Sequence, residues 1–293
     1  MVMTEAVKRL EEYDTQTRYQ ATVVSSERMT VEGSDDEIRE LVLEVDDPGL
    51  SFELLQSVGV LAPGSPDFGN EHHFRLYSVA GLPEPGPSGK PRIEIAVKRM
   101  TYIDPYSGEE YKGVASNYLC DLRAGDKITM TGPYGIVFEL PEDKDANLIM
   151  IGSGTGIAPF RAFVKHIYRD VKDWKGKIWL FYGAKSGLEM FYMNEKRDDF
   201  AQYYDEETFQ AFKALSPRPN WADPIAWDRA IAERGEELWN MFGDPKTHVY
   251  VAGLEKMRAE LDGVFGRLTG SPEKWKRRKA EMTAGKRWVE LLY

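Results

Sequence analysis

A glycine-rich turn is the part of this sequence whose residue types and spacing are best suited to hold a ligand. The run Gly152-Ser153-Gly154-Thr155-Gly156-Ile157-Ala158-Pro159 stands where an apolar segment meets the start of a helical one. Glycines allow a sharp turn and the close approach of a ligand, and free amides at a helix N-terminus attract phosphate. The run departs from the G-x-G-x-x-G fingerprint at Ile157, and no acidic residue ends the next strand to bind a ribose. A phosphate site and a ligand-free tight turn therefore both remain open.

Other chemistries find less support in the composition. The chain has 293 residues, a formal charge of −10 and one cysteine, Cys120. A single thiol excludes a disulfide framework and any iron–sulfur or zinc site built on several thiolates. His72 and His73 are adjacent, so on a strand they would face opposite sides and would not share a metal. The acidic balance argues against nucleic acid as the main partner, because no diffuse basic field is available to displace counterions.

The elements that position the glycine turn divide the chain into two predicted domains. Up to about residue 140, short alternating segments separated by glycine- and proline-rich turns predict an antiparallel barrel or sandwich. Beyond it, apolar strands alternate with helical segments, which predicts a parallel sheet with right-handed crossovers. We predict a β domain over residues 1–144 and an α/β domain over residues 145–293. The strands expected in the first are 19–25, 38–45, 74–79, 93–98 and 127–131; the second has strands at 147–152, 177–183 and 247–253 and helices at 157–170, 226–242 and 254–268.

The sequence also predicts where the protein works. Its longest apolar runs are far shorter than the roughly 20 residues that a membrane helix needs. Residues 1–14 are charged and lack the apolar core of a secretion signal. We therefore expect a cytoplasmic protein.

Four motifs in a fixed order resemble the plant-type ferredoxin–NADP(H) reductase family. The resemblance runs from about residue 74 to the C-terminus and includes the stretch GVASNYLCDLRAGDKITMTGP. It implies a six-stranded antiparallel β-barrel that carries FAD, followed by an α/β domain that receives NADP(H), in a monomeric enzyme. The motifs are Arg75-Leu76-Tyr77-Ser78, Gly113-Val114-Ala115-Ser116-Asn117-Tyr118-Leu119, Gly154-Thr155-Gly156-Ile157-Ala158-Pro159-Phe160-Arg161 and the terminal Tyr293.

The resemblance implies FAD-binding roles for residues of the barrel domain. Arg75 would pair with the pyrophosphate, a role that suits the permanent charge and bidentate geometry of a guanidinium. Tyr77 would pack on the isoalloxazine ring and Ser78 would point its hydroxyl toward flavin N5. Tyr102 would stack on the adenine. The other residues that the resemblance places at FAD are Leu76, Ala96, Lys98, Gly113, Val114, Ala115, Ser116, Thr155 and Tyr293.

Ser78, Tyr293 and Glu290 are the residues that the resemblance implies in catalysis. The ending W-V-E-L-L-Y predicts a final strand that delivers the last side chain to a fixed place. In the family the terminal tyrosine covers the flavin face that nicotinamide must reach, so nicotinamide has to displace the ring. The family glutamate stands two residues before this tyrosine. Glu290 stands three before it, so strand alternation predicts that it faces the other side.

The NADP(H) side departs further from the family pattern. The family motif C-G-L reads Ala252-Gly253-Leu254 here, and loss of the cysteine is expected to loosen nicotinamide placement. A proline separates Ser216 from Arg218, the pair implied for the 2′-phosphate, and Trp227 replaces the tyrosine implied to stack on adenine. We expect NADPH to be preferred to NADH, with a solvated proline-rich loop as the alternative. The residues implied in NADP binding are Gly154, Thr155, Gly156, Pro159, Ala184, Lys185, Ser216, Arg218, Trp227, Gly253 and Leu254.

The resemblance predicts an oxidoreductase that moves electrons between NADP(H) and a ferredoxin or flavodoxin. FAD turns a two-electron hydride donor into a source of single electrons, and nothing else in this chain accepts them, so the one-electron carrier is a separate molecule. Docking a small acidic carrier needs local positive potential on this acidic chain. The candidate cations are Lys98, Arg99, Lys274, Lys276, Arg277, Arg278 and Lys279, for which a solvated helix face is the alternative.

Two other hypotheses about the function of this chain stay open. The chain could be the NAD(P)H-dependent reductase component of a multi-component oxygenase or a similar system. It could also be a flavin electron-transfer subunit that no longer uses nicotinamide, which Ala252 and the altered 2′-phosphate pocket favour.

Overall fold

The computed structural model describes residues 9–64, 71–135, 138–219 and 223–293, so the first eight residues of the charged N-terminal segment lie outside it. Contacts divide the chain into two units. The first extends to residue 137 and includes Arg161–Lys165; the second comprises Phe138–Phe160 and His166–Tyr293. Within the described residues, no helix combines the length and apolar character needed to cross a membrane.

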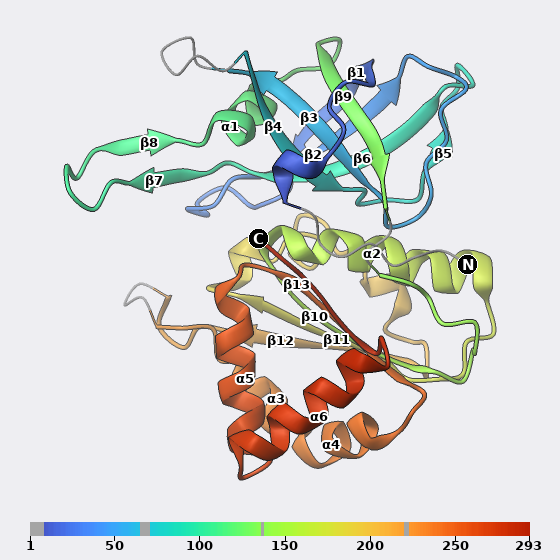
Figure 1. Cartoon of the computed structure of the whole chain (residues 1–293), viewed down its shortest axis with the longest axis vertical. Helices are drawn as coiled ribbons and strands as arrows, with labels where there is room; N and C mark the ends of the chain where they lie inside the picture. Colours follow the sequence, from blue (N-terminus) through green and yellow to red (C-terminus); the bar gives the residue numbers. More distant parts are fainter. Residues whose placement is uncertain (1–8, 65–70, 136–137, 220–222) are drawn as a thin grey trace. The chain divides into compact units, whose positions relative to one another are not determined.

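The first unit is an antiparallel β-barrel (Figure 1). Its strands are hydrogen-bonded in the order β4-β3-β9-β1-β2-β6-β5. A bridge between Val79, directly after β4, and Ile95 of β6 joins the first strand of this row to the sixth, so that six strands close on themselves and β5 pairs with β6 outside the closed ring. The predicted six-stranded barrel is thereby confirmed. The strands are β1 (Arg18–Arg28), β2 (Ile38–Val45), β3 (Ser57–Pro63), β4 (His72–Ser78), β5 (Glu84–Pro85), β6 (Pro91–Lys98) and β9 (Lys127–Tyr134).

Alternation of apolar and polar residues along these strands fills the barrel. In β2, Leu41, Leu43 and Val45 point inward and are buried, while the residues between them are partly exposed. Helix α1 (Val114–Asp121) adds Leu119 and Cys120 to this core and contacts β3 and β4. A separate hairpin of β7 (Thr101–Ile103) and β8 (Glu110–Lys112) precedes the helix. The first unit thus contains β4, β6, α1 and the hairpin, which carry all the predicted FAD residues except Thr155 and Tyr293.

The second unit is a five-stranded parallel sheet, as predicted (Figure 1). Its strands run in the order β12-β11-β10-β13-β14, so the chain moves outward from β10 in one direction and returns to the other side of it with β13. Ligands of such sheets bind beyond the carboxyl ends of the strands, at the point where the order reverses. Here that point lies between β10 and β13. The strands are β10 (Asn147–Ser153), β11 (Ile178–Ala184), β12 (Phe209–Leu215), β13 (Thr247–Gly253) and β14 (Trp288–Leu292).

Four helices share one hydrophobic cluster with one face of this sheet. Ile149 and Ile151 of β10 point into it together with Trp179 and Phe181 of β11, in keeping with the period of two along a strand. The helices are α3 (Trp227–Ala232), α4 (Gly235–Gly243), α5 (Lys256–Leu268) and α6 (Pro272–Ala284). On the other face, Phe160 of α2 (Ile157–His166) packs against Phe138, which also contacts Tyr250 of β13.

The prediction of one helix over residues 226–242 is wrong. The segment forms α3 and α4, which are separated by a turn at Arg234. A methyl group on Gly235 would lie 2.3 Å from a carbon of Leu268, so the first residue of α4 approaches α5 more closely than a side chain would allow. The glycine thus marks the place where the chain changes direction.

Candidate functional site

The glycine turn lies at the point where the strand order reverses. Gly154 has φ +53° and begins a short 3-10 turn that leads from β10 into the N-terminus of α2. A methyl group on Gly156 would lie 2.3 Å from the carbonyl oxygen of Ala252, so β13 and this turn are in direct backbone contact. The turn therefore combines a close backbone approach with the N-terminus of α2, an arrangement that favours a phosphate group.

Substitution of Gly156 tests this close contact. We expect Gly156→Ala to weaken nucleotide binding at least tenfold, because the atoms that the methyl group meets are backbone and cannot rotate away. Titration of the purified protein with NADP+ measures the effect. Gly187→Ala is the matched control, since a methyl group there meets nothing within 4 Å. Unchanged affinity in Gly156→Ala would contradict this role of the turn.

The terminal residue is fixed at the same edge of the sheet, next to the glycine turn. The phenol oxygen of Tyr293 lies 2.5 Å from Oγ1 of Thr155. The backbone N–H of Tyr293 donates to the carbonyl oxygen of Gly253 at 3.0 Å, and its own carbonyl oxygen accepts from the N–H of Glu255 at 3.1 Å. The predicted final strand is present, and the residue that follows it, Tyr293, is 57% exposed although both its backbone and its hydroxyl are hydrogen-bonded.

The β13–α5 connection completes this edge. Ala252 is buried in β13, and Gly253 follows it at φ +145°. A methyl group on Gly253 would meet Sδ of Met257 at 2.6 Å and Oγ of Ser153 at 2.7 Å. Leu254 is exposed beside it. Replacement of the family cysteine by Ala252 therefore leaves no polar side chain at the end of β13.

Glu290 belongs to an ion-pair network that secures the last strand. Its carboxylate accepts from Nε of Arg258 in α5 at 2.8 Å and from Nε1 of Trp288 at 2.7 Å, and it pairs with Nζ of Lys279 in α6 at 2.8 Å. Lys279 also pairs with Asp262 of α5 at 2.9 Å. Burial opposes ionisation of Glu290, but hydrogen bonds from Lys279, Arg258 and Trp288 outweigh it and lower the pKa of the carboxyl group. The structure gives Glu290 a role in holding β14 against α5 and α6, and its role in catalysis stays a prediction.

This network makes stability depend on pH. Because the pKa of Glu290 is lower in the folded chain than its ordinary value of 4.5, its ionised form stabilises the fold above that pH. The contribution is lost as the pH falls below 4.5 through the lowered pKa. We expect Glu290→Gln to cost about 2 kcal/mol of unfolding free energy at neutral pH, and the difference from the native chain to shrink toward acid pH. Urea unfolding at several pH values measures it; a difference that does not vary with pH would contradict the assignment.

The predicted 2′-phosphate residues follow the carboxyl end of β12, but both already have partners. Ser216 is buried and its Oγ donates to the carbonyl oxygen of Asp223 at 2.8 Å. The guanidinium of Arg218 pairs with the carboxylate of Asp223 at 2.9 and 3.3 Å. Ala184 is buried at the end of β11, and the exposed Lys185 follows it. Asp223 was not predicted from the sequence as the partner of these two residues.

Trp227 does not lie where the adenine prediction requires it. Its ring is 1% exposed and belongs to the core of the second unit. A methyl group on Gly183 would lie 2.3 Å from a ring carbon of Trp227, so the indole packs directly on the backbone of β11. Trp227 is therefore a core residue at the start of α3, and its indole is not exposed for stacking on adenine.

The predicted FAD residues of β4 fit an anionic ligand. Arg75 is exposed, and its Nη1 donates to the carbonyl oxygen of the preceding Phe74 at 2.8 Å. No carboxylate pairs with Arg75 in the part of the chain that the structure describes. Burial raises the pKa of the Tyr77 phenol, so this ring stays neutral. Ser78 ends the strand and pairs with Ser57 of β3. Leu76 lies between Arg75 and Tyr77, and Ala96 is buried in β6.

The N-terminus of α1 supplies a second feature suited to phosphate. Gly113 is the N-cap residue, and a methyl group there would lie 2.8 Å from Oγ of Ser116. Ser116 in turn accepts from the backbone N–H of Met100 at 3.2 Å. Val114 is exposed and Ala115 is buried in the first turn. Since α1 contacts β4, the N-terminal amides of α1 and the exposed Arg75 of β4 belong to neighbouring elements.

The hairpin carries a pair of stacked rings. Tyr102 and Tyr111 face each other across β7 and β8 with centroids 5.4 Å apart and an interplanar angle of 20°. Tyr102 is 59% exposed, which leaves room for a further ring on it. An exposed ring is what the predicted stacking of Tyr102 on adenine requires. Tyr111, which supports this ring from the other side, was not predicted from the sequence.

Most of the predicted docking cations are neutralised within the chain. Lys98 pairs with Asp36, and Arg99 pairs with Glu37 at 2.8 Å and Asp121 at 2.9 Å. On α6, Lys279 pairs with Asp262 and Glu290, and Arg278 pairs with Glu281 at 3.3 Å. Lys274 and Arg278 also lie over the ring of Trp239. Lys276 and Arg277 are exposed on the same helix.

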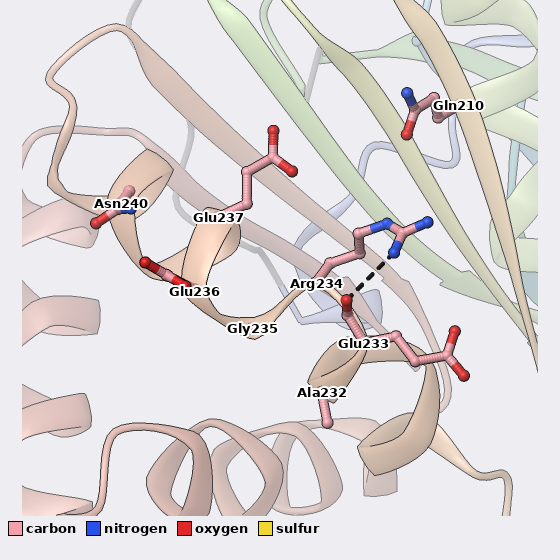
Figure 2. Close-up of a pocket in the computed structure, with 8 residues that line it drawn as sticks. All are labelled: Gln210, Ala232, Glu233, Arg234, Gly235, Glu236, Glu237 and Asn240. Atoms are coloured by element: carbon pink, nitrogen blue, oxygen red, sulfur yellow. Dashed lines mark hydrogen bonds between the residues drawn. The ribbon is translucent and has the colours of Figure 1, made fainter.

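A surface hollow of about 680 Å³ lies elsewhere in the second unit (Figure 2). It contains Gln210 near the start of β12 and the turn between α3 and α4, so it lies at the opposite end of β12 from Ser216. The carboxylates of Glu233, Glu236 and Glu237 make it acidic, with one cation, Arg234 (Figure 2). Such a lining repels nucleotide phosphates, and none of the predicted site residues lies in it.

Comparisons with known proteins agree with this arrangement. Residues 150–262 match the oxidoreductase NAD-binding domain family. A ferredoxin–NADP reductase from Spirulina is 32% identical over 288 residues, which cover 96% of this chain and 97% of that protein. The cyanelle ferredoxin–NADP reductase of Cyanophora paradoxa is 34% identical over 251 residues, 84% of this chain and 67% of the relative.

Solved structures share the fold. The ferredoxin–NADP+ reductase of Plasmodium falciparum, as an H286K mutant in complex with 2′P-AMP, aligns with a TM-score of 0.70 and 22% identity over 96% of this chain and 98% of that chain. Fold and site together define an oxidoreductase with a β-barrel unit and a nucleotide-binding parallel-sheet unit. This chain belongs to the ferredoxin–NADP reductase family.

Proposed function

We propose that this chain is an FAD-dependent reductase that transfers electrons between NADP(H) and ferredoxin or flavodoxin. Hydride carries two electrons on the nucleotide side, and the protein carrier takes them one at a time. Membership of the ferredoxin–NADP reductase family supports the reaction. The observation that carries it in this chain is the terminal Tyr293, held beside the glycine turn by Thr155 and Gly253.

The residues of the barrel unit fit FAD. The exposed Arg75 pairs with no carboxylate among the described residues, and together with the N-terminal amides of α1 and Gly113 it is suited to a pyrophosphate. Tyr77 would pack on the flavin ring, the hydroxyl of Ser78 would point toward flavin N5, and Tyr102 would stack on adenine. When bound, FAD accepts hydride and passes the electrons on singly. The protein groups bind and orient the flavin.

The parallel-sheet unit would bind NADP(H). The turn at Gly154–Gly156, with Pro159 in the first turn of α2, would hold its phosphates. Gly253 and Leu254 would border the nicotinamide, with Ala184 and Lys185 at the end of the neighbouring strand. The exposed ring of Tyr293 would occupy the nicotinamide position until the nucleotide displaces it.

The carrier would dock through the cations that the chain leaves unneutralised. Lys276 and Arg277 are exposed on α6 and remain candidates, whereas Lys98, Arg99 and Lys279 pair with carboxylates and contribute little net field. A monomeric state and a cytoplasmic location complete the proposal.

A second candidate is an NADH-linked reductase component of a multi-component system. The observation that favours it is the pairing of Arg218 with Asp223, which engages the cation that would otherwise bind the 2′-phosphate.

Anaerobic titration of the flavin-loaded protein separates these candidates. Rapid bleaching of the flavin bands by NADPH and slow bleaching by NADH is the result expected for the proposed reductase. Equal or reversed rates would favour the NADH-linked component. Flavin bands that neither nucleotide bleaches would contradict both and leave a flavin electron-transfer subunit.

A further inference from the structure

One residue, Asp223, engages both side chains predicted to bind the 2′-phosphate of NADP(H). Its backbone carbonyl oxygen accepts from Oγ of Ser216 at 2.8 Å. Its carboxylate accepts from Nε and Nη2 of Arg218 at 2.9 and 3.3 Å. Two hydrogen bonds from one guanidinium to one carboxylate form the same fork geometry with which an arginine binds a phosphate.

We infer that Asp223 is a specificity-determining residue, which competes with the 2′-phosphate for Arg218 and so lowers the preference of this chain for NADPH over NADH. The inference rests on the proposed use of nicotinamide nucleotides. Asp223 acts through Arg218, because the guanidinium is what brings a 2′-phosphate next to the carboxylate of Asp223.

The location supports this role. Ser216 directly follows β12, and its N–H donates to the carbonyl oxygen of Ala184 at the end of β11. The pair of Arg218 and Asp223 therefore stands next to the carboxyl ends of two strands, where nucleotides bind in such sheets. Arg218 is 67% exposed and can reach a ligand, while Asp223 is 21% exposed and is fixed beneath it by the bond from Ser216.

The electrostatics set the direction of the effect. A 2′-phosphate that approached Arg218 would meet the carboxylate of Asp223, and like charges in proximity disfavour binding. NADH carries no 2′-phosphate, so this repulsion does not change its affinity. A neutral residue in place of Asp223 removes the carboxylate that pairs with the guanidinium and also removes the repulsion. Only ligands with a 2′-phosphate then bind more tightly.

The test uses two fragments that need no flavin chemistry. Calorimetric titration of the full chain with adenosine 2′,5′-bisphosphate and with 5′-AMP measures the contribution of the 2′-phosphate directly. We expect Asp223→Asn to bind the bisphosphate roughly three- to tenfold more tightly and to bind 5′-AMP unchanged, because the exposed pair limits the gain. In the flavin-loaded protein, KM for NADPH would fall by the same factor and KM for NADH would not change.

Two further variants make the result specific. Arg218→Ala should lower bisphosphate affinity and abolish the gain from Asp223→Asn in the double variant, because the two residues act on one phosphate. Asp170→Asn is the matched control, since Asp170 forms a similar two-bond pair with Arg169 in the same unit but precedes β11 and lies away from the carboxyl edge. It should leave both affinities unchanged.

The outcomes separate this inference from the proposed function. Equal affinities of the native chain and Asp223→Asn for the bisphosphate, or a parallel change for 5′-AMP, would overturn the role of Asp223 and leave the reductase intact. A gain that persists without Arg218 would also overturn it. A flavin that neither NADPH nor NADH reduces would instead contradict the proposed function.

Discussion

Replacement of Tyr293 by serine is expected to raise the affinity of the flavin-loaded protein for NADP+ about tenfold. The ring is exposed at the carboxyl edge, so it is available to stack where nicotinamide must bind. Removing it deletes a competitor whose stacking is worth roughly 1 kcal/mol or more. The nicotinamide, once bound, then leaves less readily, so turnover should fall although binding improves. Difference spectra on titration with NADP+ and steady-state turnover with NADPH measure the two effects.

The variant should keep its fold, because Tyr293 is anchored through its backbone to Gly253 and Glu255. Thr155→Val serves as a control that keeps the ring and removes only its 2.5 Å hydroxyl contact. We expect a smaller gain in affinity from this change. If Tyr293→Ser left NADP+ affinity and turnover as they are, the gating role of the terminal ring would be wrong.

Replacement of Arg75 by alanine is expected to weaken FAD binding by one to two orders of magnitude. The guanidinium is exposed and makes no ion pair with a carboxylate in the described residues, so its charge is available for the pyrophosphate. Hydrogen bonds to charged groups contribute about 1.5–3 kcal/mol each, which corresponds to this loss. Equilibrium dialysis of the apoprotein against FAD measures it.

FMN provides the control ligand for Arg75, because it carries one phosphate and no pyrophosphate or adenine. Arg75→Lys keeps the positive charge but loses the bidentate geometry of the guanidinium. We therefore expect its FAD affinity to lie between those of the native chain and Arg75→Ala. An Arg75→Ala protein that retains FAD as tightly as the native chain would remove Arg75 from the cofactor site.

The fold was predictable from the sequence where residue patterns are local. Alternation in β2 and the apolar runs of β10, β11 and β13 identified these strands, since their burial repeats every two residues or is continuous. Strands β3 and β12 were not predicted, because Gly59 interrupts the apolar run SVGVLAP and because FQAFKAL does not alternate between apolar and polar residues. Their place in the sheets comes from long-range pairing with β4, β9 and β11.

The site was predictable from motifs, but its side-chain partners were not. The glycine turn and the terminal Tyr293 lie at one edge because strand ends in a parallel sheet meet there. The burial of Trp227 depends on the small Gly183 in another strand, and the partners of Glu290 come from α5 and α6. A single sequence contains no signal for such contacts, since they depend on how distant elements pack.

Electron transfer to a protein carrier is the central claim, and one measurement tests it most directly. The flavin-loaded protein is reduced anaerobically with one equivalent of NADPH and then mixed with oxidised ferredoxin in a stopped-flow spectrometer. We predict that the flavin bands return while the ferredoxin bands bleach, with two ferredoxins reduced for each flavin, because hydride carries two electrons. A reduced flavin that persists in the presence of ferredoxin and of flavodoxin, but reoxidises with oxygen, would contradict the account.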